Sequence, residues 1–219
     1  MNVVVAFSGG LDSTVLLYDQ IAAGYGVRAV TVHYGQRHAF REVRAAKDTT
    51  AELRIPHDVF DLTELLPIIC DGALGGGQEV PEGHYANDSM RATVVPNRNM
   101  MLLAVCGMVA VAKGNDAVVY GAHAGDHTIY PDCRPEFVEA MRSALGLASF
   151  EPLGLHAPFL RRTKADIVCL GAELKVPLGR TWSCYKGNRL HCGKCGTCVE
   201  RIEAFKIAGI EDPTEYEHA

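Results

Sequence analysis

The segment S-G-G-L-D-S-T, Ser8 to Thr14, brings two glycines, three hydroxyls and a carboxylate together directly after an apolar, β-branched run. Glycines allow positive φ angles and let the backbone approach a ligand closely. Asp12, Ser13 and Thr14 would begin a helix, where free N–H groups and the helix dipole attract an anion. The segment therefore predicts a phosphate-binding turn.

Two other interpretations of this turn were considered. A Walker A loop requires G-x-x-x-x-G-K-[ST], and the sequence has no lysine before Lys47. That class of nucleotide site is excluded here. Asp and Ser are also common N-cap residues, so a purely structural turn stays open on the local pattern alone.

A second set of reactive side chains lies near the C-terminus, where four cysteines follow the pattern C-x7-C-x2-C-x2-C: Cys184, Cys192, Cys195 and Cys198. Four thiolates form a closed tetrahedral zinc site, so we expect one structural Zn²⁺ per chain. An iron–sulfur cluster is the alternative, although ferredoxin runs continue with x3-C-P and this chain does not. His191 borders the cluster and is expected to be a bystander.

Strands and helices must position these groups, and their patterns alternate along the chain. Short apolar runs predict buried parallel strands, and apolar residues at helical spacing predict the helices between them. The expected strands cover residues 3–7, 27–32, 57–62 and 117–121, and the helices cover 12–22, 41–53, 99–113, 134–145 and 163–174. This order predicts an α/β fold, a doubly wound and mostly parallel sheet, in which ligands bind beyond the carboxyl ends of the strands.

The domain prediction assigns residues 1–175 to this sheet and 176–219 to a small zinc-binding region of the same compact unit. Residues 71–95 are rich in glycine and interrupt the alternation. A loop of this length in a compact domain is usually a binding loop or a lid. A merely mobile insertion is the alternative. The helix at 99–113 is expected to be buried and too short to span a bilayer.

The composition limits the class of protein. The chain has 219 residues, 48% of them hydrophobic, and a formal net charge of −5. An acidic balance argues against direct nucleic-acid binding. The first residues show no signal peptide, and the other cysteines (Cys70, Cys106, Cys133 and Cys169) are scattered, which favours a reducing compartment. We expect a cytoplasmic protein that does not bind membranes.

The motifs carry a family resemblance. S-G-G-L-D-S matches the S-G-G-x-D-S pyrophosphate loop of the ATP-pyrophosphatases. Over nearly the whole chain the sequence resembles the 7-cyano-7-deazaguanine synthase family of 7-deazapurine (queuosine-type) biosynthesis, through HYGQRH (33–38), VPNRN (95–99), YPDCRPEF (130–137), TKADIV (163–168) and TWSCY (181–185). It departs from the family pattern near the expected substrate pocket, at His33, Asn97, His127 and Ile129.

The resemblance implies an ATP-dependent carbon–nitrogen ligase that makes 7-cyano-7-deazaguanine from 7-carboxy-7-deazaguanine and ammonia. It implies cleavage of ATP between the α and β phosphates, adenylated carboxylate and amide intermediates, Mg²⁺ as a cofactor and a homodimer. The implied ATP contacts are Phe7, Ser8, Gly9, Gly10, Leu11, Asp12, Ser13, Thr14, Val15, Leu16 and Leu17.

Residue types suggest further roles at the site. Asp12 and Ser13 would face the diphosphate or its magnesium, and Lys164 would offset charge that develops at the α-phosphate. Arg98 and Arg134 would clamp the carboxylate or the phosphates, because a guanidinium presents a fork of donors. Asp132 would accept hydrogen bonds from the guanine-like edge of the substrate. A surface or helix-capping role stays open for Lys164, both arginines and Asp132.

Other functions were weighed. A relative that stops at the amide is the main alternative. A zinc-knuckle nucleic-acid binder would explain the cysteines but leaves the Ser8–Thr14 turn unexplained. A tRNA thiolase would need a persulfide-carrying cysteine near that turn. The pattern does not distinguish a product used in tRNA from one used in DNA, and it leaves the ammonia source open, free ammonium included.

Overall fold

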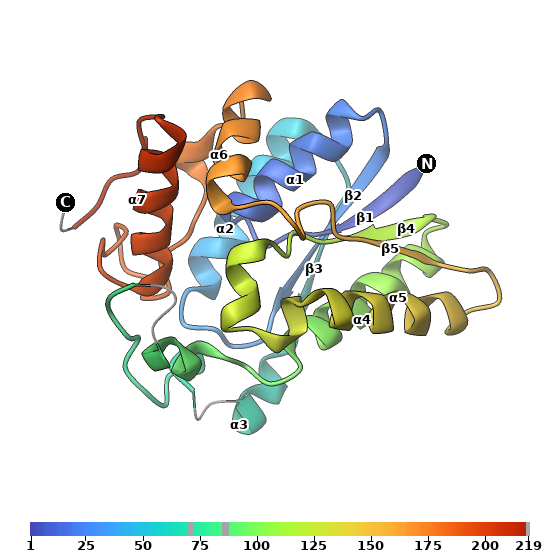
Figure 1. The fold of residues 1–219 in the computed structure, drawn as a ribbon. Helices are drawn as coiled ribbons and strands as arrows, with labels where there is room; N and C mark the ends of the chain where they lie inside the picture. Colours follow the sequence, from blue (N-terminus) through green and yellow to red (C-terminus); the bar gives the residue numbers. More distant parts are fainter. Residues whose placement is uncertain (70–71, 85–87, 218–219) are drawn as a thin grey trace.

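One parallel sheet organises the molecule. The computed structural model describes residues 1–69, 72–84 and 88–217. Its five strands lie in the order β3-β2-β1-β4-β5 (Figure 1). They are β1 (Asn2–Ala6), β2 (Gly26–His33), β3 (His57–Asp61), β4 (Ala117–Val119) and β5 (Gly154–His156). The predicted α/β fold with a parallel sheet is therefore confirmed.

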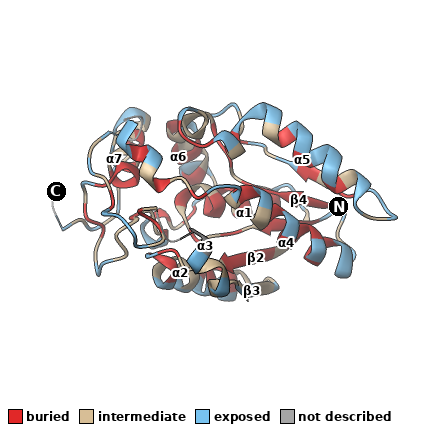
Figure 2. Ribbon diagram, turned by 90° about the horizontal axis from the view of Figure 1, so that it is seen from below, coloured by how far each residue is buried: buried red, intermediate tan, exposed pale blue. Residues whose placement is uncertain are grey.

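Helices cover both faces of this sheet, as a doubly wound fold requires. They are α1 (Leu11–Ala22), α2 (Ala39–Leu53), α3 (Leu66–Ile69), α4 (Arg98–Ala112), α5 (Pro135–Leu147), α6 (Lys164–Glu173) and α7 (Gly196–Ala208). α1, α2 and α6 pack on one face, and α4 and α5 pack on the other. Figure 2 shows buried strands between helices whose outer faces are exposed.

The sequence of β1 shows why two cores form. Val3 and Val5 contribute to the core beneath α1 and α6, whereas Val4 contributes to the core beneath α4 and α5. Successive side chains of a strand point to opposite faces, so a strand covered on both sides needs an unbroken apolar run. All three valines have no exposed surface.

Two helices and one strand were not expected from the sequence, and one helix differs from its prediction. β5, α3 and α7 are absent from the predicted set. α4 was expected to be buried, but Met100, Met108 and Val111 are exposed on its outer side. By length and composition, Asp88–Ala112 is the one described helical stretch that is apolar enough to cross a membrane, with only 33% of its apolar window buried. In the fold, α4 packs on β1 and β4.

The glycine-rich insertion lies against the C-terminal region. Its described parts are 72–84 and 88–95; residues 71 and 85–87, and also Cys70, lie outside the described residues. Gly83 N–H donates to the Lys194 carbonyl at 2.9 Å, and Arg37 N–H donates to the Leu74 carbonyl at 2.9 Å. The insertion therefore joins the β2–α2 loop to the cysteine-bearing loop.

Arg201 holds the C-terminal region together. This arginine on α7 has no exposed surface. Its guanidinium donates to Thr181 Oγ1 at 2.7 Å and to the Leu178 carbonyl at 2.9 Å, and pairs with Asp212 at 3.2 Å. A buried charge is tolerated only when it is paired and hydrogen-bonded. α7 also packs on α6, and the predicted boundary between 175 and 176 stays a prediction.

Candidate active site

A cavity of about 230 Å³ opens beyond the carboxyl ends of β1, β2 and β4. Phe7 and Ser8 border it after β1, Thr31 lies on β2, and Tyr120 and Gly121 follow β4. The strand order reverses between β1 and β4, and open α/β sheets bind ligands where such a reversal leaves a crevice. The cavity is therefore in the position that the fold favours for a ligand.

The turn between β1 and α1 needs its glycines. Gly9 has a φ of 81°, and a Cβ placed on it would lie 2.7 Å from both the Glu42 carbonyl oxygen and the Ala46 nitrogen of α2. Gly10 is the N-cap residue of α1 and makes no side-chain capping bond. The first N–H groups of the helix are thus left for a ligand, as in anion sites at helix N-termini.

Hydroxyl groups shape the same turn from inside. Ser8 Oγ accepts the Gly10 N–H at 3.1 Å and lies 3.1 Å from Ser13 Oγ. Thr14 Oγ1 donates to the Gly10 carbonyl at 2.7 Å. Asp12 stands in the first turn of α1 and does not cap it, so the purely structural alternative of an Asp or Ser N-cap does not describe this turn.

The structure places only part of the predicted ATP segment on the cavity. Phe7, Ser8, Gly10, Leu11, Asp12 and Ser13 line it. Val15, Leu16 and Leu17 have no exposed surface, because this side of α1 packs into the core. Gly9 and Thr14 belong to the turn but do not line the cavity among the described residues. The segment available to a ligand is therefore narrower than predicted.

Lys164 reaches the turn from α6 and meets two carboxylates. Its Nζ donates to Asp12 Oδ2 at 2.9 Å and lies 2.9 Å from Glu200 Oε2, which belongs to α7. Asp12 and Lys164 are 152 residues apart in the chain. The second carboxylate oxygen of Asp12 is buried and has no hydrogen-bond partner in the described structure. The predicted pair of Asp12 and Lys164 is thus brought together on the cavity.

Mutual attraction keeps this pair charged. Burial acts to raise the pKa of Asp12, but the Lys164 ammonium, with His123, acts in the opposite direction and holds the pKa below 3.8. Burial also acts to lower the pKa of Lys164, but Asp12 and Glu200 raise it above 10.5. Burial raises the pKa of Glu200 above 4.5 against the opposing effect of Lys164. At neutral pH the turn therefore faces a fixed cation.

His123 adds a ring N–H donor beside this cluster. Its ring is buried, and its Nδ1 accepts the Gly125 N–H at 3.1 Å. A ring nitrogen that accepts carries no proton, so this contact assigns the proton to Nε2. Nε2 lies 3.6 Å from Asp126 Oδ2 and 3.9 Å from Asp12 Oδ2. His123 therefore presents an N–H to the two carboxylates.

The opposite end of the cavity is aromatic and holds one guanidinium. Arg98 lies at the start of α4 with its Cζ 5.1 Å from the ring centroid of Tyr130, and its positive charge acts to lower the pKa of Tyr34. Tyr130 Oη lies 3.2 Å from Tyr185 Oη and 2.8 Å from Thr93 Oγ1. Burial raises the pKa of Tyr34 to about 12, so its phenol stays neutral.

This end suits a flat, anionic ligand. Tyr34 and Tyr185 line it together with Arg98 and Cys133. Aromatic faces accept a heterocycle by stacking, and a guanidinium binds a carboxylate through parallel N–H groups. Cys133 is buried, and burial raises the pKa of its thiol, consistent with the packing role suggested by its residue type.

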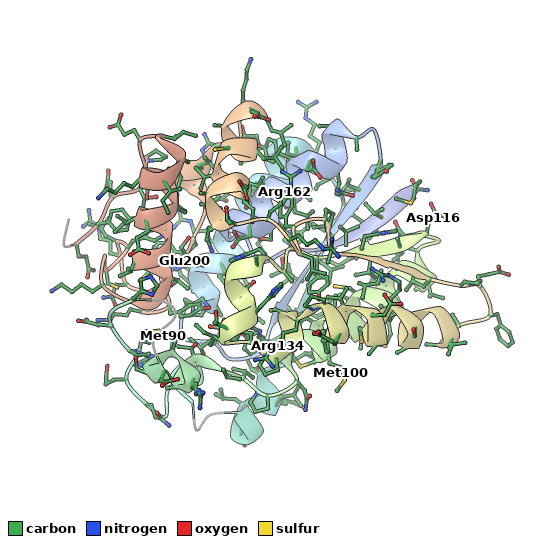
Figure 3. All side chains as sticks on the ribbon, viewed as in Figure 1. Met90, Met100, Asp116, Arg134, Arg162 and Glu200 are labelled. Atoms are coloured by element: carbon green, nitrogen blue, oxygen red, sulfur yellow. The ribbon has the colours of Figure 1, made fainter. Side chains whose placement is uncertain are left out.

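Two predicted substrate residues lie elsewhere. Asp132 Oδ2 accepts the Asn99 N–H at 2.8 Å, so it caps the start of α4. Arg134 is exposed, and its Nε donates to the His127 carbonyl at 2.9 Å (Figure 3). Neither residue borders the cavity among the described residues. Both lie on the loop and helix start that follow Tyr130, and this segment turns them away from the cavity.

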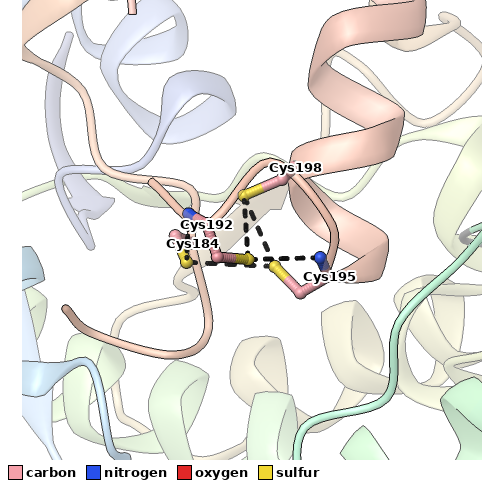
Figure 4. A group of neighbouring side chains, drawn as sticks. All are labelled: Cys184, Cys192, Cys195 and Cys198. Atoms are coloured by element: carbon pink, nitrogen blue, oxygen red, sulfur yellow. Dashed lines mark hydrogen bonds between the residues drawn. The ribbon is translucent and has the colours of Figure 1, made fainter. Parts of the chain in front are cut away.

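The four cysteines form a compact, buried group (Figure 4). Their sulfur atoms all lie within 4.8 Å of one another, including 3.9 Å between Cys192 and Cys198 and 3.4 Å between Cys195 and Cys198. Zn–S bonds of ~2.3 Å in a tetrahedron separate the sulfurs by about 3.8 Å. The four thiolates therefore fit a tetrahedral metal ion. His191, next to Cys192 in the sequence, makes a different contact. His191 Nε2 accepts the Ser183 N–H at 3.0 Å.

Comparison with known proteins gives a consistent result. A family model described as "Queuosine biosynthesis protein QueC" matches residues 2–209. Relatives named 7-cyano-7-deazaguanine synthase are 50% identical in Caldicellulosiruptor bescii, over 99% of this chain and 98% of the relative, and 49% identical in Marinobacter nauticus, over 99% and 97%. A third relative of this name, from Methanoregula boonei, is 49% identical over 99% of this chain and all of the relative.

The chain belongs to the QueC family. A more distant solved structure shows the fold alone. The crystal structure of a predicted subunit of tRNA methyltransferase from Methanocaldococcus jannaschii superimposes with a TM-score of 0.52. It is 17% identical in sequence and covers 79% of this chain and 75% of its own. The family resemblance inferred from the motifs is therefore confirmed.

The departures from the QueC-type motifs leave the cavity lining intact. Asn97 has a φ of 58°, and asparagine is one of the few residues that adopt the left-handed region in place of glycine. Ile129 is buried in the core, and His33 is half-buried with Nδ1 3.9 Å from Asp61. His127 Nε2 is buried without a hydrogen-bond partner in the described structure. None of the four lines the cavity in the part of the chain that the structure describes, although Tyr34, Arg98 and Asp126, next to three of them in the sequence, do.

Several cavity residues were not singled out from the sequence. Tyr34, Gln36 and His38 line the cavity. They belong to the HYGQRH motif that carries the family resemblance, so this motif could have indicated them as site residues. Tyr120 and Asp126 follow β4, and their position after a strand end was a usable indication. Glu200 contacts Lys164 from outside the cavity lining of the described residues, and no local sequence pattern pointed to it.

Proposed function

We propose that this QueC-family protein converts 7-carboxy-7-deazaguanine and ammonia to 7-cyano-7-deazaguanine with two ATP. The observation that carries the proposal is the uncapped start of α1, which opens on the cavity beside the Asp12–Lys164 pair. Helix N–H groups and a fixed ammonium stabilise charge on phosphates. The names of the relatives supply the substrate class.

The proposed reaction balances in two adenylations. The substrate carboxylate attacks the α-phosphate of ATP, diphosphate leaves from the turn, and ammonia displaces AMP to give the amide and a proton. The amide oxygen then attacks the α-phosphate of a second ATP and a second diphosphate leaves. Loss of AMP, which takes the amide oxygen, and of both amide N–H protons gives the nitrile. Each oxygen that leaves the substrate carbon thus departs as part of AMP. A phosphate is a far better leaving group than oxide.

The residues of the cavity supply binding and charge. The turn from Ser8 to Ser13 holds the diphosphate, and Lys164 faces the phosphoryl group that is transferred. Arg98, rather than Arg134, offers its guanidinium to the substrate carboxylate, because Arg98 lines the cavity. Tyr34 and Tyr185 enclose the heterocycle.

Two metals complete the proposal. The unpartnered oxygen of Asp12 is a hard ligand suited to the Mg²⁺ that accompanies ATP, where the ion would neutralise phosphate charge. The four cysteines would hold one structural Zn²⁺. We also propose that the protein is a cytoplasmic homodimer and that it binds no nucleic acid. The formal net charge of −5 supports the absence of nucleic-acid binding.

Product analysis tests this function. Incubation of the purified protein with 7-carboxy-7-deazaguanine, ATP and ammonium should yield the nitrile by mass spectrometry, together with AMP and diphosphate. Two AMP should appear per nitrile, and ADP should not accumulate. Supplying the amide with ATP should give the nitrile with one AMP. ADP and orthophosphate as products would contradict the role of the turn.

The same experiment distinguishes the nitrile-forming enzyme from a relative that stops at the amide. A relative that stops at the amide would accumulate the amide with one AMP and would not convert added amide. The cavity lining favours the nitrile, because the four departures from the family motifs lie outside it among the described residues. Binding of RNA that weakens with added salt, without turnover, would instead indicate a nucleic-acid-binding protein.

A further inference from the structure

Glu200 connects the cysteine-bearing segment with the phosphate-binding turn. It lies on α7, two residues after Cys198, and Figure 3 shows it on the inner side of that helix. Its Oε2 lies 2.9 Å from Lys164 Nζ, and the same ammonium lies 2.9 Å from Asp12 Oδ2. Lys164 is therefore held from two sides by carboxylates of different segments.

The surroundings leave the Glu200 carboxylate little freedom. The side chains of Glu200 and Lys164 are each 12% exposed. A Cβ placed on Gly125 would lie 2.9 Å from Glu200 Oε1, so this glycine makes room for the carboxylate. Cys195 is the N-cap residue of α7 and Cys198 lies in its first turn. The cysteine cluster thus fixes the start of the helix that presents Glu200.

A lysine needs such a restraint to hold one position. Its ammonium is carried on a flexible four-carbon chain, which loses rotamer freedom when the charge is held in place. Asp12 alone is a poor anchor, because it lines the cavity and its other carboxylate oxygen has no hydrogen-bond partner in the described structure, so the carboxylate is drawn toward a bound cation. Glu200 has no such competing task, since it does not border the cavity among the described residues.

We propose that Glu200 is a positioning residue that acts through Lys164 and keeps the ammonium directed at the phosphate-binding turn. The cysteine-bearing segment then contributes to turnover as well as to stability. The kinetic part rests on the proposed function, in which Lys164 faces the transferred phosphoryl group. The restraint itself rests only on the contacts among Asp12, Lys164 and Glu200.

A double-mutant cycle tests the kinetic part. Glu200→Gln should lower kcat about 10- to 100-fold, the loss typical of a misplaced catalytic group, and change the KM for ATP far less. In the Lys164→Ala background the same substitution should have no further effect. Metal content and melting temperature should match the wild type. Glu203→Gln is the matched control, because Glu203 is on α7, 46% exposed, and pairs with His84. An equal loss in both backgrounds, or an unchanged kcat, would overturn the proposal.

A spectroscopic measurement tests the restraint without turnover. In protein labelled with ¹⁵N at lysine Nζ, the ammonium of Lys164 should give a resonance protected from solvent exchange, assigned by its loss in Lys164→Ala. Glu200→Gln should remove the protection and Glu203→Gln should retain it. Protection that persists in Glu200→Gln would overturn the inference, whatever the products are. Absence of turnover in the wild type would contradict the proposed function alone.

Discussion

At the scale of single residues, the site depends on one cation placed among acids. Lys164 is flanked by Asp12 and Glu200. Asp126 is close to His123, whose ring also lies near Asp12. Without this ammonium, the carboxylates would repel a polyphosphate. Asp12 and Ser13 line the cavity beside this cation, and one oxygen of Asp12 has no hydrogen-bond partner in the described structure.

Removal of either side chain of the turn should be costly to turnover. Asp12→Ala and Ser13→Ala should each reduce the rate about 10²- to 10³-fold, as for other preorganised stabilisers of developing charge. The fold should stay intact, which circular dichroism and thermal melting would check. Asp19→Ala, on the same helix but away from the cavity, is the control. Near wild-type turnover in both turn variants would remove the turn from the mechanism.

At the scale of elements, the cysteine loop and α7 act on the site from one side. Trp182 N–H donates to the Gly9 carbonyl at 3.0 Å, and Trp182 Nε1 donates to the Cys184 carbonyl at 2.8 Å. Its ring centroid lies 4.3 Å from that of His191. The segment that carries the first cysteine is therefore hydrogen-bonded to the Ser8–Thr14 turn.

Loss of one cysteine should destabilise this segment. Cys195→Ser should lower the metal content and the melting temperature together, because a closed thiolate site contributes directly to folding. Metal analysis of the colourless wild type should give about one zinc per chain. Cys169→Ser, at a half-buried position on α6, should keep both values. A brown protein that carries iron after anaerobic purification would show that the metal is misassigned.

At the scale of the whole molecule, His57 joins three elements. It begins β3, its Nε2 lies 2.8 Å from Thr31 Oγ1 of β2, and its Nδ1 lies 3.0 Å from Thr50 Oγ1 of α2. Burial lowers the pKa of His57 below 6.5 in the folded protein. The unfolded chain therefore binds this proton first when the pH falls.

Stability should follow from that difference in proton uptake. The contribution of neutral His57 is present above pH 6.5 and is lost as the pH falls from 6.5 to the lower pKa of the folded state. Urea unfolding between pH 7.5 and pH 5 should show a decline in the free energy of unfolding. This decline should be smaller in His57→Gln. Equal declines in both proteins would contradict the lowered pKa.

The sequence by itself determined the features that depend on neighbouring residues. The Ser8–Thr14 turn, the cysteine spacing and four of the five strands follow from local pattern, because glycine conformations, ligand spacing and apolar periodicity are encoded over a few residues. β5 is only three residues long and α7 lacks a clear apolar stripe, so neither was predicted.

Only the tertiary structure decided which side chains meet. Lys164 lies 152 residues from Asp12, and their contact depends on the packing of α6 against α1, which no local pattern reports. The packing of α4 on β1 and β4 placed Arg98 at the cavity, whereas Arg134 is exposed and Asp132 caps a helix. Residue type predicted that these charges matter, but the direction of each side chain was set by the elements that carry it.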